Sequence, residues 1–330
     1  MHADLPEPEL ATYTSTLQEP TDFDDFWTRT LAEARIHPLG VEWSPAATAL
    51  TTVDVFDVRF NGAGGQPIAA WLRIPAGARG PLPVVVEYDG YGRGRGTSEQ
   101  NLLWASAGFA HLEMDTRGQS WSGWRSATAD PVGGDAHMPG MLTKGIADPH
   151  DYYYRRVFTD AVRAIESLRD LPSVDTDQVF VLGTSQGGGI ALAAAALSGL
   201  VSGAIIRVPF LCDIPRAIRI TDAYPYRELA DYLAVYRDRE ESTLRTLSYF
   251  DGVQFARRAA APAVFSVGLM DQVCPPSTVY AAFNAYAGEK VINKWRYSGH
   301  EGGGIDDDLL AISAMRRWRR ISRWRKGSGL

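Results

Sequence analysis

A serine flanked by glycines has the spacing that a nucleophilic side chain needs. The pattern G-x-S-x-G is matched by Gly183-Thr184-Ser185-Gln186-Gly187. In this pattern the serine lies on a tight turn between a strand and a helix, and the glycines permit close backbone approach. An apolar run at 179–182 precedes the motif, and an alanine-rich run at 188–197 follows it. These flanks favour a nucleophilic Ser185 over the alternative, an ordinary glycine-rich turn.

The positions of the histidines indicate a base for this serine. In folds that carry the motif, the catalytic residues follow the chain order serine, acid, histidine. His300 is the one histidine after Ser185, and the others all precede it: His2, His37, His111, His137 and His150. His300 also lies in a glycine-rich loop, 298–304, after a strand-like run. The sequence therefore predicts His300 as the general base, with a surface loop histidine as the alternative.

The acid that orients this histidine comes from ten carboxylates between Ser185 and His300. Asp271 directly follows the apolar run 263–270, so it should lie at the carboxyl end of a strand, where sites of open α/β sheets collect. Asp238 and Asp251 fall in a strand-free segment, and we expect both to be exposed to solvent. Asp271 is the predicted acid, which would hold the imidazole tautomer and stabilise the imidazolium ion.

Two backbone N–H groups are needed to stabilise the oxyanion that forms when a serine attacks a carbonyl group. One should belong to Gln186, the residue after the nucleophile. The other should come from the loop 87–94, where Tyr91 stands between two glycines. The alternative is a simple connection in which Tyr91 only packs. Phosphate binding by this loop is disfavoured, because no G-x-x-x-x-G-K-[ST] pattern follows.

The elements that must position these residues alternate between strands and helices. Strand-like runs occur at 84–86, 109–114, 179–182, 204–208, 264–268 and 294–297. Helical patterns occur at 157–168, 188–197, 277–286 and 306–321. Short β-branched runs separated by helices predict right-handed crossovers and a mostly parallel sheet covered on both faces.

Two segments depart from this alternation. The N-terminal part, about 1–50, contains a predicted helix near Asp22–Ala32, and an antiparallel hairpin with strands at 53–60 and 68–74 follows it. Residues 210–258 contain no strand-like run, so we expect a helical cap inserted above the sheet. We predict a single α/β domain over 1–330.

Composition excludes several classes of function. The chain has 330 residues, of which 45% are hydrophobic, and its formal net charge of −6 gives no reason to expect nucleic acid or an anionic membrane as a partner. No stretch approaches the ~20 apolar residues that cross a bilayer. The first ten residues lack the features of a signal peptide, so we expect a cytoplasmic protein. Cys212 and Cys274 fit two buried thiols better than a disulfide.

Three motifs together resemble carbohydrate esterase family seven, the acetyl xylan esterases and cephalosporin C deacetylases of the α/β-hydrolase fold. They are Arg117-Gly118-Gln119, the Ser185 motif with Gly183 and Gly187, and His300-Glu301. The segment 268–278 also resembles the acid loop of that family. The resemblance covers nearly the whole chain, and the combination of motifs is far more specific than any one of them.

The resemblance implies a triad of Ser185, Asp271 and His300, with the backbones of Tyr91 and Gln186 as oxyanion donors. It also implies release of acetate from small acetylated sugars, xylo-oligosaccharides or cephalosporin C, without a cofactor or metal, by a homohexamer. Arg117 and Gln119 should be structural, because buried polar groups near a site must be hydrogen-bonded.

Two features depart from the family pattern. Trp121 and Trp124 stand where smaller residues would be usual, and they should either pack or narrow the pocket, with packing slightly favoured. The tail 316–326 is unusually basic and is expected to form a solvated helical face. Two other classes stay open: a serine peptidase of the prolyl oligopeptidase type, which usually adds a propeller, and a non-catalytic protein that retains the fold.

Overall fold

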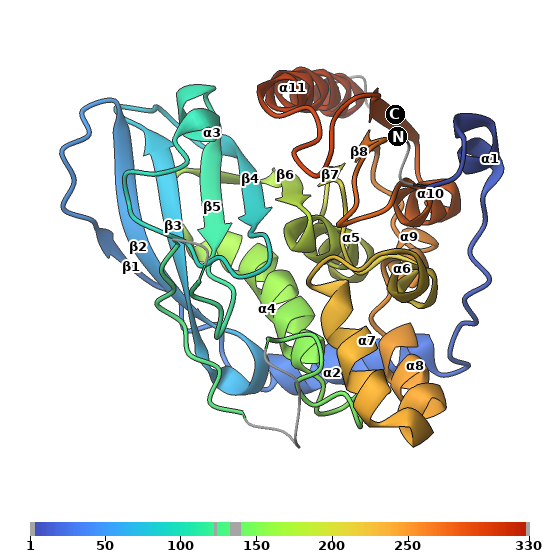
Figure 1. The fold of residues 1–330 in the computed structure, drawn as a ribbon. Coiled ribbons are helices and arrows are strands. Elements are labelled where there is room, and N and C mark those ends of the chain that lie inside the picture. Colours follow the sequence, from blue (N-terminus) through green and yellow to red (C-terminus); the bar gives the residue numbers. More distant parts are fainter. Residues whose placement is uncertain (1–3, 122–123, 133–139, 328–330) are drawn as a thin grey trace.

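The computed structural model describes residues 4–121, 124–132 and 140–327, so His2 and His137 lie outside the described residues. The described residues form one nine-stranded sheet with the order β1-β2-β3-β5-β4-β6-β7-β8-β9 (Figure 1). The strands are β1 Glu42–Pro45, β2 Val53–Asn61, β3 Pro67–Pro75, β4 Leu82–Tyr88, β5 Ala110–Met114, β6 Val174–Thr184, β7 Gly203–Arg207, β8 Ala263–Gly268 and β9 Lys290–Trp295.

Most of this sheet is parallel, as the alternation of strands and helices predicted. Strands β4 to β9 all run in the same direction, whereas β1, β2 and β3 pair antiparallel at one edge. The predicted hairpin is β2 with β3, in a register that pairs Val53 with Pro75 and Asn61 with Pro67. Because parallel strands end at the same edge of a sheet, the loops after β4, β6, β8 and β9 meet there.

Helices cover both faces of the sheet. The helices are α1 Glu7–Thr12, α2 Phe23–Arg35, α3 Leu103–Ser106, α4 Tyr153–Ser167, α5 Gln186–Ser198, α6 Ile214–Ile220, α7 Tyr226–Val235, α8 Glu240–Ser248, α9 Gly252–Ala256, α10 Pro276–Ala285 and α11 Ile305–Gly327. Short 3-10 helices occupy η1 Ala63–Gly65, η2 Leu168–Asp170 and η3 Arg237–Arg239. Helices α4, α5 and α10 contact one face, and α3 and α11 contact the other.

Side chains alternate between two hydrophobic cores along the buried strands. In β4, Val84 and Val86 belong to the large core with α4 and α5, while Val85 belongs to the core beneath α11. This period of two is what a strand with both faces buried requires. The long apolar runs in the sequence follow from it, since neither face can be polar.

The predicted elements are confirmed, with differences at their ends. The last strand, β9, begins at Lys290 and ends at Trp295, so the predicted run 294–297 was displaced toward the following turn. Strand β1 and the short helices α1 and α3 were not predicted, because four to six residues carry too little periodicity. Helix α11 is longer than predicted and includes the basic tail, in which Arg316, Arg317 and Arg320 are exposed.

The segment 210–258 contains helices and no strand, as its sequence indicated. The prediction for Asp238 is confirmed, because this residue is exposed. The prediction for Asp251 is wrong, because this residue is fully buried. Its carboxylate caps α9 by accepting the N–H of Val253, and it also accepts the N–H groups of Asp213 and Ile214. These three backbone donors explain why an acid is buried there.

The N-terminal helix and the cysteines agree with the sequence. Helix α2 buries Phe23, Phe26 and Trp27, and the Trp27 indole N–H donates to the carbonyl oxygen of Tyr249 at 3.0 Å. Both cysteines are buried free thiols. Among the described residues, no helix has both the length and the apolar character needed to span a bilayer.

Candidate active site

Ser185 occupies a strained turn between β6 and α5. Its backbone has φ 60° and ψ −121°, a conformation that residues with a side chain rarely adopt. The turn is also crowded, because a Cβ added to Gly183 would collide with the Gly187 carbonyl, and one added to Gly187 would collide with the carbonyl of Tyr88. The two glycines of the motif are therefore required by close packing, and strain at such a turn is typical of functional sites.

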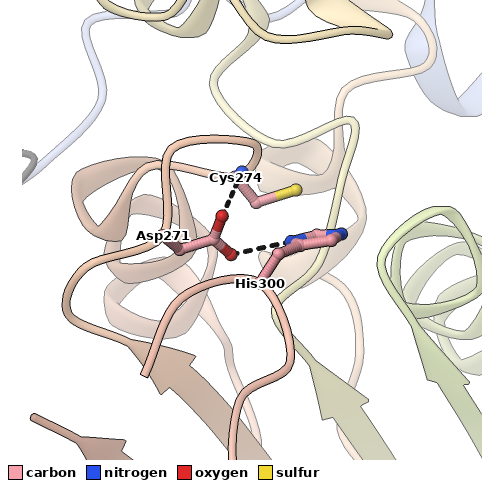
Figure 2. Close-up of side chains that lie close together, drawn as sticks. All are labelled: Asp271, Cys274 and His300. Carbon is pink, nitrogen blue, oxygen red and sulfur yellow. Dashed lines mark hydrogen bonds and ion pairs between the residues drawn. The ribbon is translucent and has the colours of Figure 1, made fainter. Parts of the chain in front are cut away.

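Ser185, His300 and Asp271 form one chain of hydrogen bonds. The His300 Nε2 lies 2.9 Å from the Ser185 Oγ, and the His300 Nδ1 lies 2.8 Å from the Asp271 Oδ2. Figure 2 shows the second of these contacts. With the ring proton on Nδ1, the histidine donates to Asp271 and accepts the hydroxyl proton of Ser185. Such an arrangement can activate a serine for attack on a carbonyl group.

Asp271 is held more rigidly than a solvated carboxylate would be. Its side chain is fully buried, and its Oδ1 accepts the N–H groups of Val273 and Cys274 at 2.8 and 3.0 Å. The Cys274 bond is drawn in Figure 2. These bonds turn Oδ2 toward His300, so the carboxylate can orient the ring.

Asp271, Cys274 and His300 are also the one group among the described residues whose ligand atoms, within 4.8 Å of one another, could hold a metal ion. Both oxygens of Asp271 already accept hydrogen bonds from N–H groups. Burial raises the pKa of the Cys274 thiol well above its ordinary value. Because metals bind the thiolate, these contacts favour a hydrogen-bonded acid over a metal ligand.

The two predicted oxyanion donors lie on neighbouring loops. Tyr91 follows β4, and Gln186 is the first residue of α5, directly after Ser185. The first N–H groups of a helix have no acceptor within the helix, and the helix dipole adds positive potential there. The Gln186 N–H is therefore suited to an anion beside Ser185.

Gln119 links these two loops through its side chain. Its Oε1 accepts the N–H of Gly92 at 2.7 Å, and its Nε2 donates to the Gln186 Oε1 at 2.8 Å and to the Tyr153 hydroxyl at 3.0 Å. Gln119 and Gln186 are both fully buried. One side chain therefore fixes the residue after Tyr91 relative to Gln186, although it touches neither Ser185 nor His300 in these contacts.

Arg117 acts at a greater distance from Ser185. Its guanidinium is fully buried, and it binds Asp160 through two hydrogen bonds of 2.6 and 2.8 Å and also donates to Gln66. Gly118 follows with φ +71° and donates its N–H to the carbonyl of Thr128. These bonds join the motif to helix α4 and to the hairpin, as expected for structural residues.

A pocket of about 1030 Å³ opens above Ser185 and His300. Pockets for small ligands usually measure about 300–1000 Å³, so this one has room for a sugar ring. Trp121 lines the pocket and is 40% exposed, so the prediction that it only packs is wrong. Trp124 is half-buried and lies under the guanidinium of Arg93 at 5.1 Å, so packing is confirmed for this tryptophan.

Comparisons with known proteins decide which family has this site. The model of the acetyl xylan esterase (AXE1) family matches residues 1–310. The chain belongs to the acetyl xylan esterase family. Its sheet and helices are those of the α/β-hydrolase fold. The earlier identification with carbohydrate esterase family seven is confirmed.

Three relatives agree with this assignment. The structure of an acetyl xylan esterase from Paenibacillus sp. R4 is 38% identical with a TM-score of 0.89, covering 94% of this chain and 99% of that one. Acetyl xylan esterase 1 from Thermoanaerobacterium sp. JW/SL YS485 is 33% identical with a TM-score of 0.87, covering 96% and 99%. The acetyl esterase Axe7A of Xylanibacter ruminicola is 31% identical over 279 residues, which are 83% of this chain and only 62% of that protein.

Two glutamates complete the site of this acetyl xylan esterase family member. Glu301 was predicted from the His300-Glu301 motif, and it is exposed at the pocket wall, where its Oε1 accepts the N–H of Gly299 at 3.0 Å. It thus stabilises the turn that carries His300. Glu228 was not predicted, although it also lines the pocket. No motif marks it, and its partner Tyr91 is 137 residues away in the sequence.

Proposed function

We propose that this protein is a serine esterase that removes acetyl groups from small acetylated sugars. The substrates would include acetylated xylo-oligosaccharides and the acetyl ester of cephalosporin C. We assign Ser185 as the nucleophile, His300 as the base and Asp271 as the orienting acid.

The chain of hydrogen bonds from Ser185 through His300 to Asp271 is the observation that supports this proposal most strongly. It lies beneath a pocket in a chain that belongs to the acetyl xylan esterase family. Two solved structures of acetyl xylan esterases, 38% and 33% identical to this chain, are each matched over 99% of their own length. This agreement favours esterase chemistry over a peptidase of the prolyl oligopeptidase type.

The first step of the proposed reaction forms an acetyl-enzyme. The Ser185 Oγ bonds to the carbonyl carbon of the acetyl ester while the His300 Nε2 takes the hydroxyl proton. The carbonyl oxygen becomes an oxyanion, which accepts hydrogen bonds from the N–H groups of Tyr91 and Gln186. Removing one such donor typically raises the barrier by ~3 kcal/mol. The intermediate collapses when His300 protonates the leaving sugar oxygen and the ester bond breaks.

The second step releases acetate. His300 takes a proton from a water molecule as the water oxygen bonds to the acetyl carbon. The same two N–H groups hold the second oxyanion. The bond to the Ser185 Oγ then breaks, and His300 returns the proton to this oxygen. Asp271 stays ionised throughout and stabilises the imidazolium ion. No cofactor takes part in the proposed reaction.

The variant Ser185→Ala tests the proposed nucleophile. We expect hydrolysis of p-nitrophenyl acetate to fall by about 10⁴-fold or more, while the circular dichroism spectrum and the melting temperature stay close to those of the parent protein. Ser198→Ala, at the other end of α5, is the matched control and should retain full activity. Substantial activity in Ser185→Ala would refute the mechanism.

A panel of esters tests the proposed substrate class. We expect acetyl esters to react faster than butyryl or longer esters, and acetate to be released from acetylated xylo-oligosaccharides. A preference for butyrate would contradict the acetyl esterase, and cleavage of an aminoacyl amide would favour a peptidase.

A cytoplasmic location stays a prediction, and fractionation of the producing cells would test it.

A further inference from the structure

A buried carboxylate on helix α7 joins the segment 210–258 to the loop that carries Tyr91. Glu228 is 4% exposed, and its two carboxylate oxygens accept the Tyr91 hydroxyl at 2.7 and 2.9 Å. Its Oε2 also accepts the N–H of Leu142 at 3.0 Å. Segments that are distant in the sequence therefore meet at one carboxylate, which lines the same pocket as Ser185.

Tyr91 is fixed at its side chain and at the following peptide. Its hydroxyl oxygen accepts the N–H of Met141 at 2.5 Å, and its ring packs edge-on against Trp121 with the centroids 5.5 Å apart. The next peptide is held as well, since the Gly92 N–H donates to Gln119 and the Gly92 carbonyl accepts the Trp121 N–H at 2.9 Å. These contacts restrain the Tyr91 side chain and the peptide that follows Tyr91, and Glu228 is the charged partner among them.

No lysine, arginine or histidine of the described residues forms an ion pair with Glu228. The titratable groups that interact with it are tyrosines: Tyr91, Tyr152, Tyr154 and Tyr224. Arg93 and His300 line the same pocket. Burial raises the pKa of Glu228 to about 7. The tyrosines stay neutral at that pH, because the pKa of each is raised above its ordinary value of 10.0.

Charged groups on the elements packed around α7 are engaged elsewhere or exposed. Arg227 pairs with Asp222 and Asp231, Arg216 pairs with Asp4, and Lys144 pairs with Asp130. On η3, Arg239 donates to the Tyr232 hydroxyl, and Arg237 and Asp238 are exposed, as is Arg219 on α6. The charge of Glu228 is therefore directed at the Tyr91 hydroxyl and the Leu142 N–H.

We propose that Glu228 is a positioning residue for deacetylation. By accepting the hydrogen bond of the Tyr91 hydroxyl, it holds the backbone N–H of Tyr91 in the oxyanion hole. The inference rests on the proposed function and names a contribution to it from helix α7. Hydrogen bonds to an ionised acceptor are roughly twice as strong as those between neutral groups. The ionised carboxylate therefore holds Tyr91 more firmly than the protonated acid does. Glu228 touches no reacting atom and acts through Tyr91 alone.

Variants at both ends of this contact test the inference. Glu228→Ala removes the acceptor, and Tyr91→Phe removes the hydroxyl but keeps the ring and the backbone N–H. In each variant we expect kcat for p-nitrophenyl acetate to fall by about tenfold with KM nearly unchanged, since the oxyanion forms only on the way to the transition state. The double variant should be no slower than either single one, because both changes break the same contact. Glu240→Ala, exposed on α8, should leave kcat unchanged.

The pH profile distinguishes positioning by charge from a merely structural role. Glu228→Gln keeps an acceptor oxygen without the charge. We expect it to be a few-fold slower than the parent protein at about pH 8 and equal to it at about pH 6, where the parent carboxyl is itself protonated. The two proteins are compared at the same pH, so the ratio of their rates removes effects that are common to both.

Three outcomes would overturn the inference: kcat within twofold of the parent in both Glu228→Ala and Tyr91→Phe, additive losses in the double variant, or a rate ratio for Glu228→Gln that does not change with pH. If Glu228→Ala fails to fold, Tyr91→Phe and Glu228→Gln still decide it. Activity that survives in Ser185→Ala would instead refute the proposed function, so the two failures are distinguishable.

Discussion

At the residue scale, the buried side chains of Gln119 and Gln186 hold the loops around the proposed active site in place. Gln119 and Gln186 lie against each other and against the hydroxyls of Tyr153 and Tyr154, with Gln186 also donating to the carbonyl of Asp89. A neutral amide can both donate and accept, so it can join backbone groups that differ in polarity. This explains why a glutamine, rather than an acid, stands beside the proposed oxyanion hole, where a negative charge would oppose the one that develops.

The variant Gln119→Ala tests the bridge that the Gln119 side chain forms between Gly92 and Gln186. The Gly92 N–H would lose its acceptor and the Gln186 amide would lose one of its buried partners, so we expect the free energy of unfolding to fall by about 1–3 kcal/mol. We also expect kcat to fall by about tenfold or more, because the two proposed oxyanion donors would no longer be held together. Urea unfolding and steady-state kinetics measure the two effects. Gln100→Ala, which removes a hydrogen bond to Thr97 outside the pocket, is the control and should leave kcat unchanged. An unchanged kcat in Gln119→Ala would show that the bridge is dispensable.

Some site residues could be predicted because local sequence determines them. Ser185 requires a strand, a turn and a helix in immediate succession, and His300 is the one histidine that follows it. Glu228 could not be found in this way, since its environment is created by Tyr91 and Leu142, which are far away in the sequence. The burial of Asp251 was missed for the same reason, because two of its donors lie 37 and 38 residues before it.

At the element scale, Asp251 connects the start of α6 to the start of α9. It accepts N–H groups from both elements, and burial near Asp213 raises its pKa to about 7. Because the folded pKa lies above the unfolded value, ionisation of Asp251 costs folding free energy. That cost grows as pH rises from about 4 to about 7 and is constant above this range.

Asp251→Asn removes this dependence on pH. The variant loses one acceptor at every pH, but its stability relative to the parent protein should improve as pH rises from about 5 to about 8. Urea unfolding of both proteins across this range measures the difference. Asp238→Asn is the matched control, because Asp238 is exposed and its substitution should shift nothing. A difference between Asp251→Asn and the parent that stays constant with pH would contradict the raised pKa.

The strands show where sequence patterns fail at this scale. Central strands such as β7 and β8 are continuous apolar runs, because both of their faces are covered, and they were predicted within a residue of their ends. Strand β9 is at the sheet edge and is only half-buried. Its sequence therefore mixes polar and apolar residues, and no apolar run marks its first residue. Strand β1, at the opposite edge, is exposed throughout and has no apolar pattern to detect.

At the scale of the whole molecule, apolar side chains remain exposed near the start of α11. Tyr297, Ile305 and Leu309 are 84%, 61% and 55% exposed. We propose a homohexamer, as the family resemblance implies, and an assembly would give such side chains an opportunity for burial. Light scattering coupled to size exclusion should therefore give a mass six times the chain mass of 36.1 kDa. A mass equal to that of one chain would contradict the hexamer.

The order in which the site's parts occur along the chain has a consequence for biosynthesis. Tyr91 and Ser185 follow β4 and β6 in the middle of the sheet, whereas His300 follows β9, which pairs only with β8 at the edge. A ribosome therefore adds the proposed nucleophile and its surroundings long before it adds the proposed base. A nascent chain that still lacks β9 also lacks His300, so under the proposed mechanism it would cleave no ester. Under the proposed mechanism, hydrolysis would begin only when the last strand joins the edge and brings His300 to Ser185, so the onset of activity would report that the sheet is complete.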